Sequence, residues 1–268
     1  MVIKPKVRGF ICTASHPKGC AAHVQEQIDY IKEQIPDTPA NAPKNVLVIG
    51  SSTGYGLASR LVSAFGYGAK TLGLFFEKEA SERKTGTAGW YNNRGFELAA
   101  DKAGLWHKSL NGDAFSHQAK EDAIKITTEE MGKIALVVYS LASPRRQAPD
   151  SVEVYKTVLK PIGEAVTEKT LNTDKGEVHD ISIEPATEDD INNTIKVMGG
   201  EDWELWMNAL DEANVLADGV KTVAYTYIGK KLTWPIYGHA TIGKAKEDLD
   251  RASHAIHNKL QDKYNGTA

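Results

Sequence analysis

The segment NVLVIGSSTGYGLAS, residues 45–59, constrains the fold of this 268-residue chain more than any other. The residues before Gly50 form a continuous run rich in β-branched side chains, which is typical of a strand buried on both faces. Gly54 and Gly56 complete the pattern G-x-x-x-G-x-G, and apolar residues at helical spacing continue to Gly66. A buried strand, a glycine-rich turn and a helix form the first half of a βαβ unit, so the segment predicts a parallel sheet.

The same alternation of strand and helix continues as far as Ser143. Ser116 has the residue type of a helix N-cap, and Gly104 closes the helix before it. Strands are predicted within 45–50, 71–77, 105–115 and 134–143, and helices within 55–66, 90–104 and 117–131. This alternation predicts an α/β fold in which a doubly wound, Rossmann-like parallel sheet carries helices on both faces.

The rest of the chain adds elements to this sheet. Residues 144–186 are polar and rich in turn residues, so we expect them to leave the main sheet. Helices are predicted at 21–34 and 238–263, two more between 184 and 216 are broken at Gly199-Gly200, and a strand is predicted at 221–229. We expect a single domain with an N-terminal extension, a dinucleotide-binding half, a helical insertion and a strand-helix unit, at 1–44, 45–143, 144–219 and 220–268.

Composition and charge argue against several classes of function. The net charge of −3 gives no reason to expect a nucleic acid or an anionic membrane as partner. No run of eighteen apolar residues occurs, so no membrane span is expected. The histidines and the two cysteines lack zinc-ligand spacing, so we expect neither a metal site nor a disulfide framework. The N-terminus lacks the features of a signal peptide, and we expect a cytoplasmic protein.

The glycine-rich turn predicts a dinucleotide site. Small residues let the backbone approach a pyrophosphate, whose charge then meets the N–H groups of the helix N-terminus. Ser51, Ser52 and Thr53 add hydroxyl donors to this turn. The alternative is a tight turn between strand and helix that binds no ligand.

An acidic residue follows the second predicted strand. Glu77 lies 21 residues after Gly56, close to the separation expected of a carboxylate that accepts from the adenosine ribose. A carboxylate there repels a 2′-phosphate, so NADH is expected to be preferred over NADPH, although the neighbouring Lys78 softens this preference. The alternative is a solvated glutamate at a strand end.

The third and fourth predicted strands also end in candidate cofactor residues, because ligands of such sheets bind at the carboxyl edge. Asp113 is positioned to accept from the adenine amino group while Ala114 leaves room for the ring, and Leu141 and Ala142 are expected along the nicotinamide ribose. Asp113 as a plain turn residue remains an alternative. The arginine pair 145–146 is a candidate for the phosphates of a carrier thioester or a pair of exposed cations.

Seven strings in the chain carry a resemblance to a known family. They are HPKGC (16–20), GTAGWYNN (86–93), NGDAFS (111–116), VYSLASPRR (138–146), KVMGGEDWELW (196–206), YTYIG (225–229) and IYGHATIGKAK (236–246). Together they resemble the trans-2-enoyl reductases of the FabV/Ter type over essentially the whole chain. The resemblance implies a monomeric, NADH-dependent enzyme of the enlarged short-chain reductase type. Such an enzyme reduces the C=C bond of enoyl-ACP or enoyl-CoA in the final reductive step of fatty acid chain elongation.

The resemblance also implies a catalytic pair. Short-chain reductases usually place a lysine four residues after the tyrosine, whereas Lys244 and Lys246 lie seven and nine residues after Tyr237. The family spacing Y-x8-K implies that Tyr237 and Lys246 are catalytic, that Lys244 is a bystander, and that Tyr227 contacts the substrate.

The cofactor positions implied by the resemblance are Gly50, Ser51, Ser52, Thr53, Gly54, Tyr55, Phe76, Glu77, Asp113, Ala114, Leu141, Ala142 and Lys246. Family members continue beyond the point where this chain ends, with a further strand, a segment that contacts the nicotinamide, and helices. A carbonyl reductase with the same Tyr–Lys chemistry and a dinucleotide-binding module without turnover are the competing hypotheses.

Overall fold

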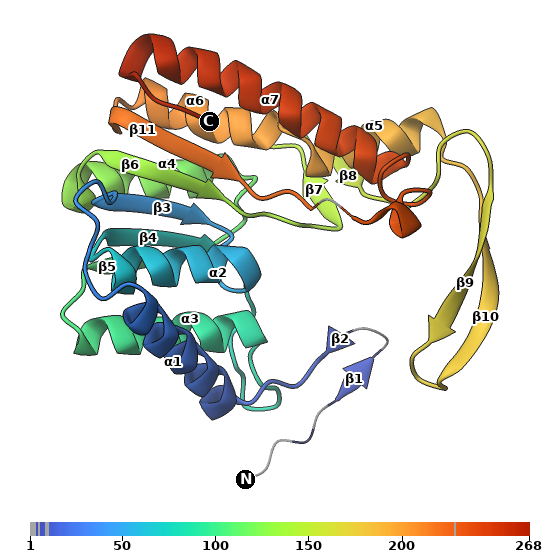
Figure 1. Ribbon diagram of the computed structural model, residues 1–268, viewed down its shortest axis with the longest axis horizontal. Helices are drawn as coiled ribbons and strands as arrows, with labels where there is room; N and C mark the ends of the chain where they lie inside the picture. Colours follow the sequence, from blue (N-terminus) through green and yellow to red (C-terminus); the bar gives the residue numbers. More distant parts are fainter. Residues whose placement is uncertain (1–3, 5, 9–10, 228) are drawn as a thin grey trace. The chain divides into compact units, whose positions relative to one another are not determined.

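The computed structural model describes residues 4, 6–8, 11–227 and 229–268, which form two compact units (Figure 1). The first unit contains the described residues up to Ser140 together with Ala209–Tyr225 and Leu260–Ala268. The second unit contains Leu141–Asn208 and Thr226–Lys259.

A parallel five-stranded sheet forms the centre of the first unit. Its strands, in spatial order, are β11 (Leu216–Ala224), β6 (Ile134–Tyr139), β3 (Asn45–Ile49), β4 (Lys70–Phe75) and β5 (His107–Asn111). The strand order reverses between β3 and β6, and in open α/β sheets a ligand binds at the carboxyl ends of the strands beside such a reversal. Since the glycine-rich turn directly follows β3, the fold puts it at this point.

Helices pack against the sheet and against one another in the first unit. These are α1 (Pro17–Gln34), α2 (Gly54–Leu61) with its π-helical continuation η1 (Val62–Gly66), α3 (Ala88–Lys102), and α4 (His117–Ile126) with its continuation η2 (Thr127–Met131). A shared apolar cluster joins α1, α2 and α3 through Val24, Ile28, Leu61 and Phe96. Each such fully buried side chain contributes about 1.5–3 kcal/mol, so this cluster fixes the two helices that border the glycine-rich turn.

The first helix begins four residues earlier than predicted. Pro17 occupies its first turn, and Nδ1 of the N-cap His16 accepts from the Gly19 N–H at 3.1 Å. A proline without an N–H is favourable at a helix start. Before this helix, β1 (Val7–Arg8) pairs antiparallel with β2 (Ile11–Cys12).

The second unit contains two hairpins and several helices. The hairpins are β7 (Arg145–Gln147) with β8 (Val154–Lys156) and β9 (Val166–Asn172) with β10 (Glu177–Ile183). The helices are α5 (Glu188–Met198), α6 (Glu201–Glu212), η3 (Lys231–Thr233) and α7 (Thr241–Tyr264), and the last turns of α6 and α7 belong to the first unit. Arg146 is buried and donates to Glu201 Oε2 at 2.7 Å, whereas Arg145 is exposed, so the two arginines do not form the pair of exposed cations that was one alternative for them.

The predicted doubly wound sheet, N-terminal elements and helical insertion are confirmed, as is the departure of 144–186 from the main sheet. The last strand differs from the prediction, because it starts at Leu216 and ends at Ala224. Its register against β6 shifts between Leu216 and Lys221, which hides the strand pattern at its start. The organisation as a single domain with the stated boundaries stays a prediction.

Within the described part of the chain, no helix has both the length and the apolar character that crossing a membrane requires. The same residues contain no group of three or more His, Cys, Asp or Glu side chains arranged to hold a metal ion.

Candidate functional site

The turn after β3 has a backbone that only glycine adopts easily. Gly50 has φ of +87° and Gly54 has φ of +53°, both in the left-handed region. The N–H groups of Gly50 and Ser51 donate to Leu74 O at 2.8 and 2.9 Å, which ties the turn to β4. The sequence pattern G-x-x-x-G-x-G therefore reflects a conformational requirement at its first two positions.

The third glycine of the pattern is required by space. A Cβ at Gly56 would lie far inside van der Waals contact with Gly50 O, and 3.3 Å from Ser140 Cβ. The absence of a side chain lets α2 start directly behind the turn. The N–H groups of its first turn have no acceptor within the helix, so they are available to an anion.

The polar side chains of the turn fit a phosphate-bearing cofactor. Ser51 is fully buried, and its hydroxyl has no hydrogen-bond partner among the described residues. Thr53 is the exposed N-cap of α2 and makes no capping bond with its side chain. A buried hydroxyl without a partner is costly unless a ligand group completes it. Beside them, Tyr55 is exposed.

Glu77 lies one residue beyond the exposed Phe76 and is anchored on two sides. Its carboxylate Oε1 accepts from Ser52 Oγ at 2.7 Å. Its backbone N–H donates to Asn111 Oδ1 at 2.9 Å, and its carbonyl accepts from Asn111 Nδ2 at 3.0 Å. The structure thus joins the turn after β3, the end of β4 and the end of β5 at one edge of the sheet.

Asp113 lies in the turn after β5 and takes part in it. Its Oδ1 accepts from the Phe115 N–H at 3.0 Å, and its carbonyl accepts from the Ser116 N–H at 3.0 Å. Ala114 is buried, and its carbonyl accepts from the ammonium of buried Lys120 at 3.1 Å. Asp113 therefore acts as a turn residue, which was one of the two alternatives for it. In these bonds its carboxylate uses Oδ1 and not Oδ2.

Leu141 and Ala142 are the first residues of the second unit, half-buried and exposed respectively. They directly follow Ser140, whose N–H donates to Ile49 O at 2.8 Å. Hence β3 and β6 end side by side in the first unit. The glycine-rich turn follows β3, and Leu141 and Ala142 follow soon after β6.

In the second unit, one lysine and two tyrosines form a cluster. Lys246 Nζ donates to Thr226 Oγ1 at 2.8 Å and lies 5.7 Å from the ring centroid of Tyr227. Tyr227 and Tyr237 meet edge to face, with ring centroids 5.8 Å apart. Partial burial lowers the pKa of the Lys246 ammonium from its ordinary value, partly offset by Asp250. A cation is thus held beside the ring of Tyr227, which in turn packs against the ring of Tyr237.

The other lysine of the segment has no part in this cluster. Lys244 is exposed and pairs with Glu247 one turn along the helix, at 2.7 Å. Tyr237 precedes α7 in a turn in which its N–H donates to Thr233 O at 2.8 Å. Tyr237 is thus linked to Lys246 through the ring of Tyr227, and the catalytic pair with spacing Y-x8-K stays a prediction.

Several residues of the site were not identified from the sequence. Tyr225 stacks on Tyr55 with ring centroids 5.2 Å apart, and its hydroxyl lies 2.8 Å from Ser59 Oγ. Asn111 holds Glu77, and Asn92 Nδ2 donates to Ser52 O at 3.1 Å. Tyr225, Asn111 and Asn92 lie in the strings YTYIG, NGDAFS and GTAGWYNN, so the family resemblance was the signal that could have identified them. Ser59 lies in none of these strings.

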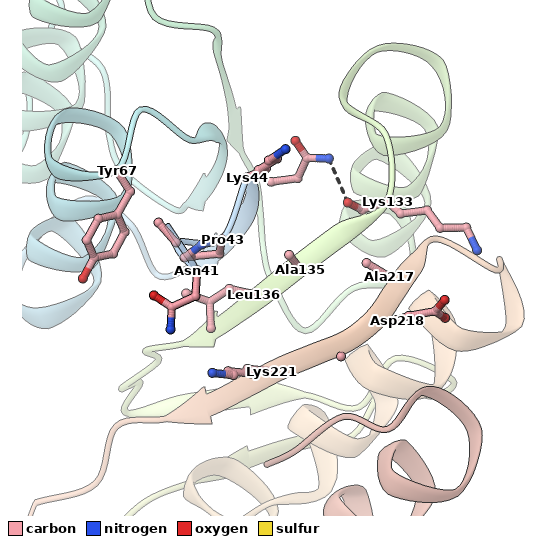
Figure 2. Close-up of a pocket in the computed structure, with 13 residues that line it drawn as sticks. Asn41, Pro43, Lys44, Tyr67, Lys133, Ala135, Leu136, Ala217, Asp218 and Lys221 are labelled. Carbon is pink, nitrogen blue, oxygen red and sulfur yellow. Dashed lines mark hydrogen bonds between the residues drawn. The ribbon is translucent and has the colours of Figure 1, made fainter. Parts of the chain in front are cut away.

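A pocket of about 490 Å³ lies at the opposite edge of the same sheet (Figure 2). Asn45, Lys133 and Gly219 line it, at the amino ends of β3 and β6 and in the irregular part of β11. Figure 2 shows the side chains of Lys133 and Lys221 extending in opposite directions. This pocket is separate from the glycine-rich turn, and its cations do not converge on one point.

Comparison with known proteins matches both parts of the chain. Residues 84–268 match the family model of the trans-2-enoyl-CoA reductase catalytic region, and residues 2–82 match that of the NAD(P)H binding domain of trans-2-enoyl-CoA reductase. An enoyl-[acyl-carrier-protein] reductase [NADH] of Pseudoalteromonas translucida is 66% identical over 268 residues, which is all of this chain and 67% of the relative. The chain thus spans about two thirds of that protein.

Solved structures agree with these matches. The trans-2-enoyl-CoA reductase of Treponema denticola in complex with NAD is similar with a TM-score of 0.93 and 46% identity, over all of this chain and 67% of that one. A short chain dehydrogenase from Mycobacterium smegmatis shares 15% identity with a TM-score of 0.51, over 86% of this chain and 76% of its own, and this likeness concerns the fold alone.

Proposed function

The chain belongs to the trans-2-enoyl-CoA reductase family, and from that premise we propose that it reduces the C=C bond of trans-2-enoyl thioesters with NADH. The thioester carrier in this proposal is acyl carrier protein or coenzyme A, and the reaction is the last reductive step of fatty acid chain elongation. We propose a monomeric, cytoplasmic enzyme, as the family resemblance implies.

Most of the proposed cofactor contacts belong to the first unit. The N–H groups at the start of α2, with the hydroxyls of Ser51 and Thr53, would bind the pyrophosphate. Glu77 would accept from the adenosine ribose and Asp113 from the adenine amino group, while Leu141 and Ala142 would line the nicotinamide ribose. The remaining proposed contacts are Gly50, Ser52, Gly54, Tyr55, Phe76 and Ala114. Bound NADH would supply the hydride for the β-carbon of the substrate.

The second unit would supply the polar groups for the chemistry. Negative charge develops on the thioester oxygen as the double bond is reduced, and the phenol O–H of Tyr237 would donate to that oxygen. Lys246 would place a positive charge beside the phenols and donate to the ribose hydroxyls. Tyr227 would contact the substrate beside Tyr237.

One observation carries this assignment of roles. Lys246 lies over the ring of Tyr227, which in turn meets Tyr237, whereas Lys244 is tied to Glu247 at the surface. A module that only binds a dinucleotide has no need of a cation held over one tyrosine ring that packs against a second. The cluster therefore favours an enzyme over a non-catalytic binding module.

The loss of NADH absorbance with two substrates tests the proposal. Crotonyl-CoA offers an activated C=C bond, and acetoacetyl-CoA offers a ketone in a similar carrier. We expect NADH oxidation with crotonyl-CoA and none above background with acetoacetyl-CoA. Oxidation with acetoacetyl-CoA alone would instead assign a carbonyl reductase. Tight NADH binding without turnover of either substrate would favour the binding module.

A further inference from the structure

We propose that Gly89 is a specificity-determining residue for the cofactor, because it leaves the space in which the carboxylate of Glu77 is held as a fixed barrier to a 2′-phosphate. This inference rests on the proposed function, in which Glu77 faces the adenosine ribose. It adds that discrimination between NADH and NADPH depends on the anchoring of the carboxylate as well as on its charge.

A glycine is needed at position 89 because there is no room for a Cβ atom, and not because of its backbone conformation. Gly89 is the second residue of α3 and has no positive φ, so an alanine there would adopt the same backbone. A Cβ at this position would overlap the carboxylate of Glu77 and lie 2.8 Å from Ser52 Oγ. Cβ atoms essentially never come within 3.0 Å of another residue, so one of the groups must move. The carboxylate thus occupies the place of the missing side chain.

The carboxylate of Glu77 lies beside the first turn of α3, next to Gly89. Ser52 Oγ donates to the same carboxylate at 2.7 Å, and Asn92 of α3 holds the Ser52 carbonyl at 3.1 Å. The helix therefore positions the acceptor and its donor together.

The backbone on either side of the carboxylate is held as well. Asn111 pairs with both backbone groups of Glu77, and Lys78 N–H donates to Thr87 Oγ1 at 3.2 Å, at the N-cap of α3. A glutamate on an unrestrained strand end swings aside when a 2′-phosphate approaches, whereas a glutamate held at backbone and side chain does not. The anchored carboxylate leaves Oε2 to accept from a ribose hydroxyl and opposes a phosphate at the same place.

The substitution Gly89→Ala tests this mechanism in binding experiments. The carboxylate would have to withdraw by more than about 1 Å to make room for the methyl group. We expect the dissociation constant for NADH to rise about tenfold or more, as loss of one charge-assisted hydrogen bond implies. Binding of NADPH should weaken less or improve, so the ratio of the two affinities should narrow. Isothermal titration with each cofactor measures both constants without turnover.

Gly19→Ala is the matched control, because Gly19 lies in the first turn of α1 and an added Cβ there meets only His16, at 3.5 Å. The affinity ratio should be unchanged in this variant. A double-mutant cycle with Glu77→Ala separates specificity from folding. In the Glu77→Ala background the carboxylate is absent, so adding Gly89→Ala should not change the ratio of NADH affinity to NADPH affinity any further.

Three results would overturn the inference, and they can be told apart. If the unmodified chain prefers NADH and Gly89→Ala keeps the same affinity ratio, the inference is wrong while the proposed function stands. A narrowing by Gly89→Ala that persists in the Glu77→Ala background would also refute it, because the effect would not act through the carboxylate. If the unmodified chain binds neither cofactor, the proposed function fails and the inference fails with it.

Discussion

Replacing each lysine of the IYGHATIGKAK segment with methionine tests the catalytic cluster most directly. Methionine keeps most of the aliphatic stem and removes the charge. Lys246 holds its ammonium 5.7 Å from the Tyr227 ring centroid and 2.8 Å from Thr226 Oγ1. Lys244 holds its ammonium 2.7 Å from Glu247, with both side chains exposed. The two substitutions are therefore chemically identical and differ only in what surrounds the charge.

The expected effect of Lys246→Met is calculated for a developing charge that lies about as far from the ammonium as the Tyr227 ring centroid, 5.7 Å. A unit charge about 6 Å from a developing negative charge stabilises it by about 3 kcal/mol at an effective dielectric constant near 20, and by about 0.7 kcal/mol in water. Since Lys246 is only partly buried, screening reduces the larger value, and we expect kcat/KM to fall about 10- to 100-fold in Lys246→Met. An exposed pair such as Lys244–Glu247 contributes about 0–1 kcal/mol to stability, and Lys244→Met should change kcat/KM less than about threefold.

Initial rates of NADH oxidation with crotonyl-CoA give kcat/KM, and titration with NADH gives the cofactor affinity of each variant. Circular dichroism shows whether the variants fold. If Lys244→Met loses tenfold or more while Lys246→Met stays within threefold of the unmodified chain, the assignment of the pair is wrong. A loss in both variants together with altered circular dichroism would point to α7 as a structural element and would equally refute the argument.

Three further predictions concern the same site. Tyr237→Phe should lower kcat by about 100- to 1,000-fold, as loss of one oxyanion donor does, with NADH affinity retained; near-normal turnover, with the loss found in Tyr227→Phe instead, would transfer the donor role. Gly56→Ala should abolish measurable NADH binding because its Cβ overlaps Gly50 O, which forces the glycine-rich turn and the start of α2 apart; unchanged NADH affinity in a folded Gly56→Ala variant would refute the steric argument. Burial lowers the pKa of Lys246 from 10.5, so its charge is lost as pH rises through a value below 10.5, and NADH affinity should decline there in the unmodified chain but not in Lys246→Met.

Much of the nucleotide-binding half was predictable because its signals are local. The buried run before Gly50, the three glycines and the helix behind them occur within one segment, and each reflects a constraint that is visible along the chain. Two positive φ angles and one close backbone approach account for the three glycines. The ends of β4 and β5 were predictable for the same reason, as strand and turn residues adjoin there.

The start of β11 was not predictable, and the cause is a local irregularity. Leu216 pairs with Ile134 and Lys221 pairs with Leu136, so an advance of five residues along β11 matches an advance of two residues along β6. Gly219 in this stretch has φ of +70°. Such a bulge breaks the alternation by which a strand is recognised, so the pattern emerges only after it. At its other end, β11 stops at Ala224, so Tyr225 and Tyr227 lie beyond the strand.

Arg60 is a buried residue that no sequence pattern identified. It lies on α2, is fully buried, and donates to Asn93 Oδ1 at 2.7 Å, Lys108 O at 2.6 Å and Ser109 Oγ at 3.0 Å. Its guanidinium also lies 4.0 Å from the ring centroid of Phe96. Burial lowers the pKa of Arg60 to about 9, partly offset by the charge of a nearby glutamate. In the sequence, this arginine sits in an amphipathic helix pattern in which a polar residue is expected to face solvent.

The free-energy cost of burying Arg60 is close to the gain from its contacts, so this residue adds little net stability and serves mainly to fix the positions of its partners. Removing a guanidinium from water costs several kcal/mol, and each hydrogen bond from a charged donor returns about 1.5–3 kcal/mol, so three bonds and a ring contact roughly offset the cost. What remains is a rigid connection between α2, which starts at the glycine-rich turn, α3, which carries Gly89, and β5, which ends at Asn111. Gly73 of β4 makes room for it, because a Cβ there would overlap the guanidinium. The partners are separated by up to 49 residues along the chain, which is why a local pattern cannot reveal them. Through this connection, the elements that anchor Glu77 and those proposed to bind the pyrophosphate are positioned together.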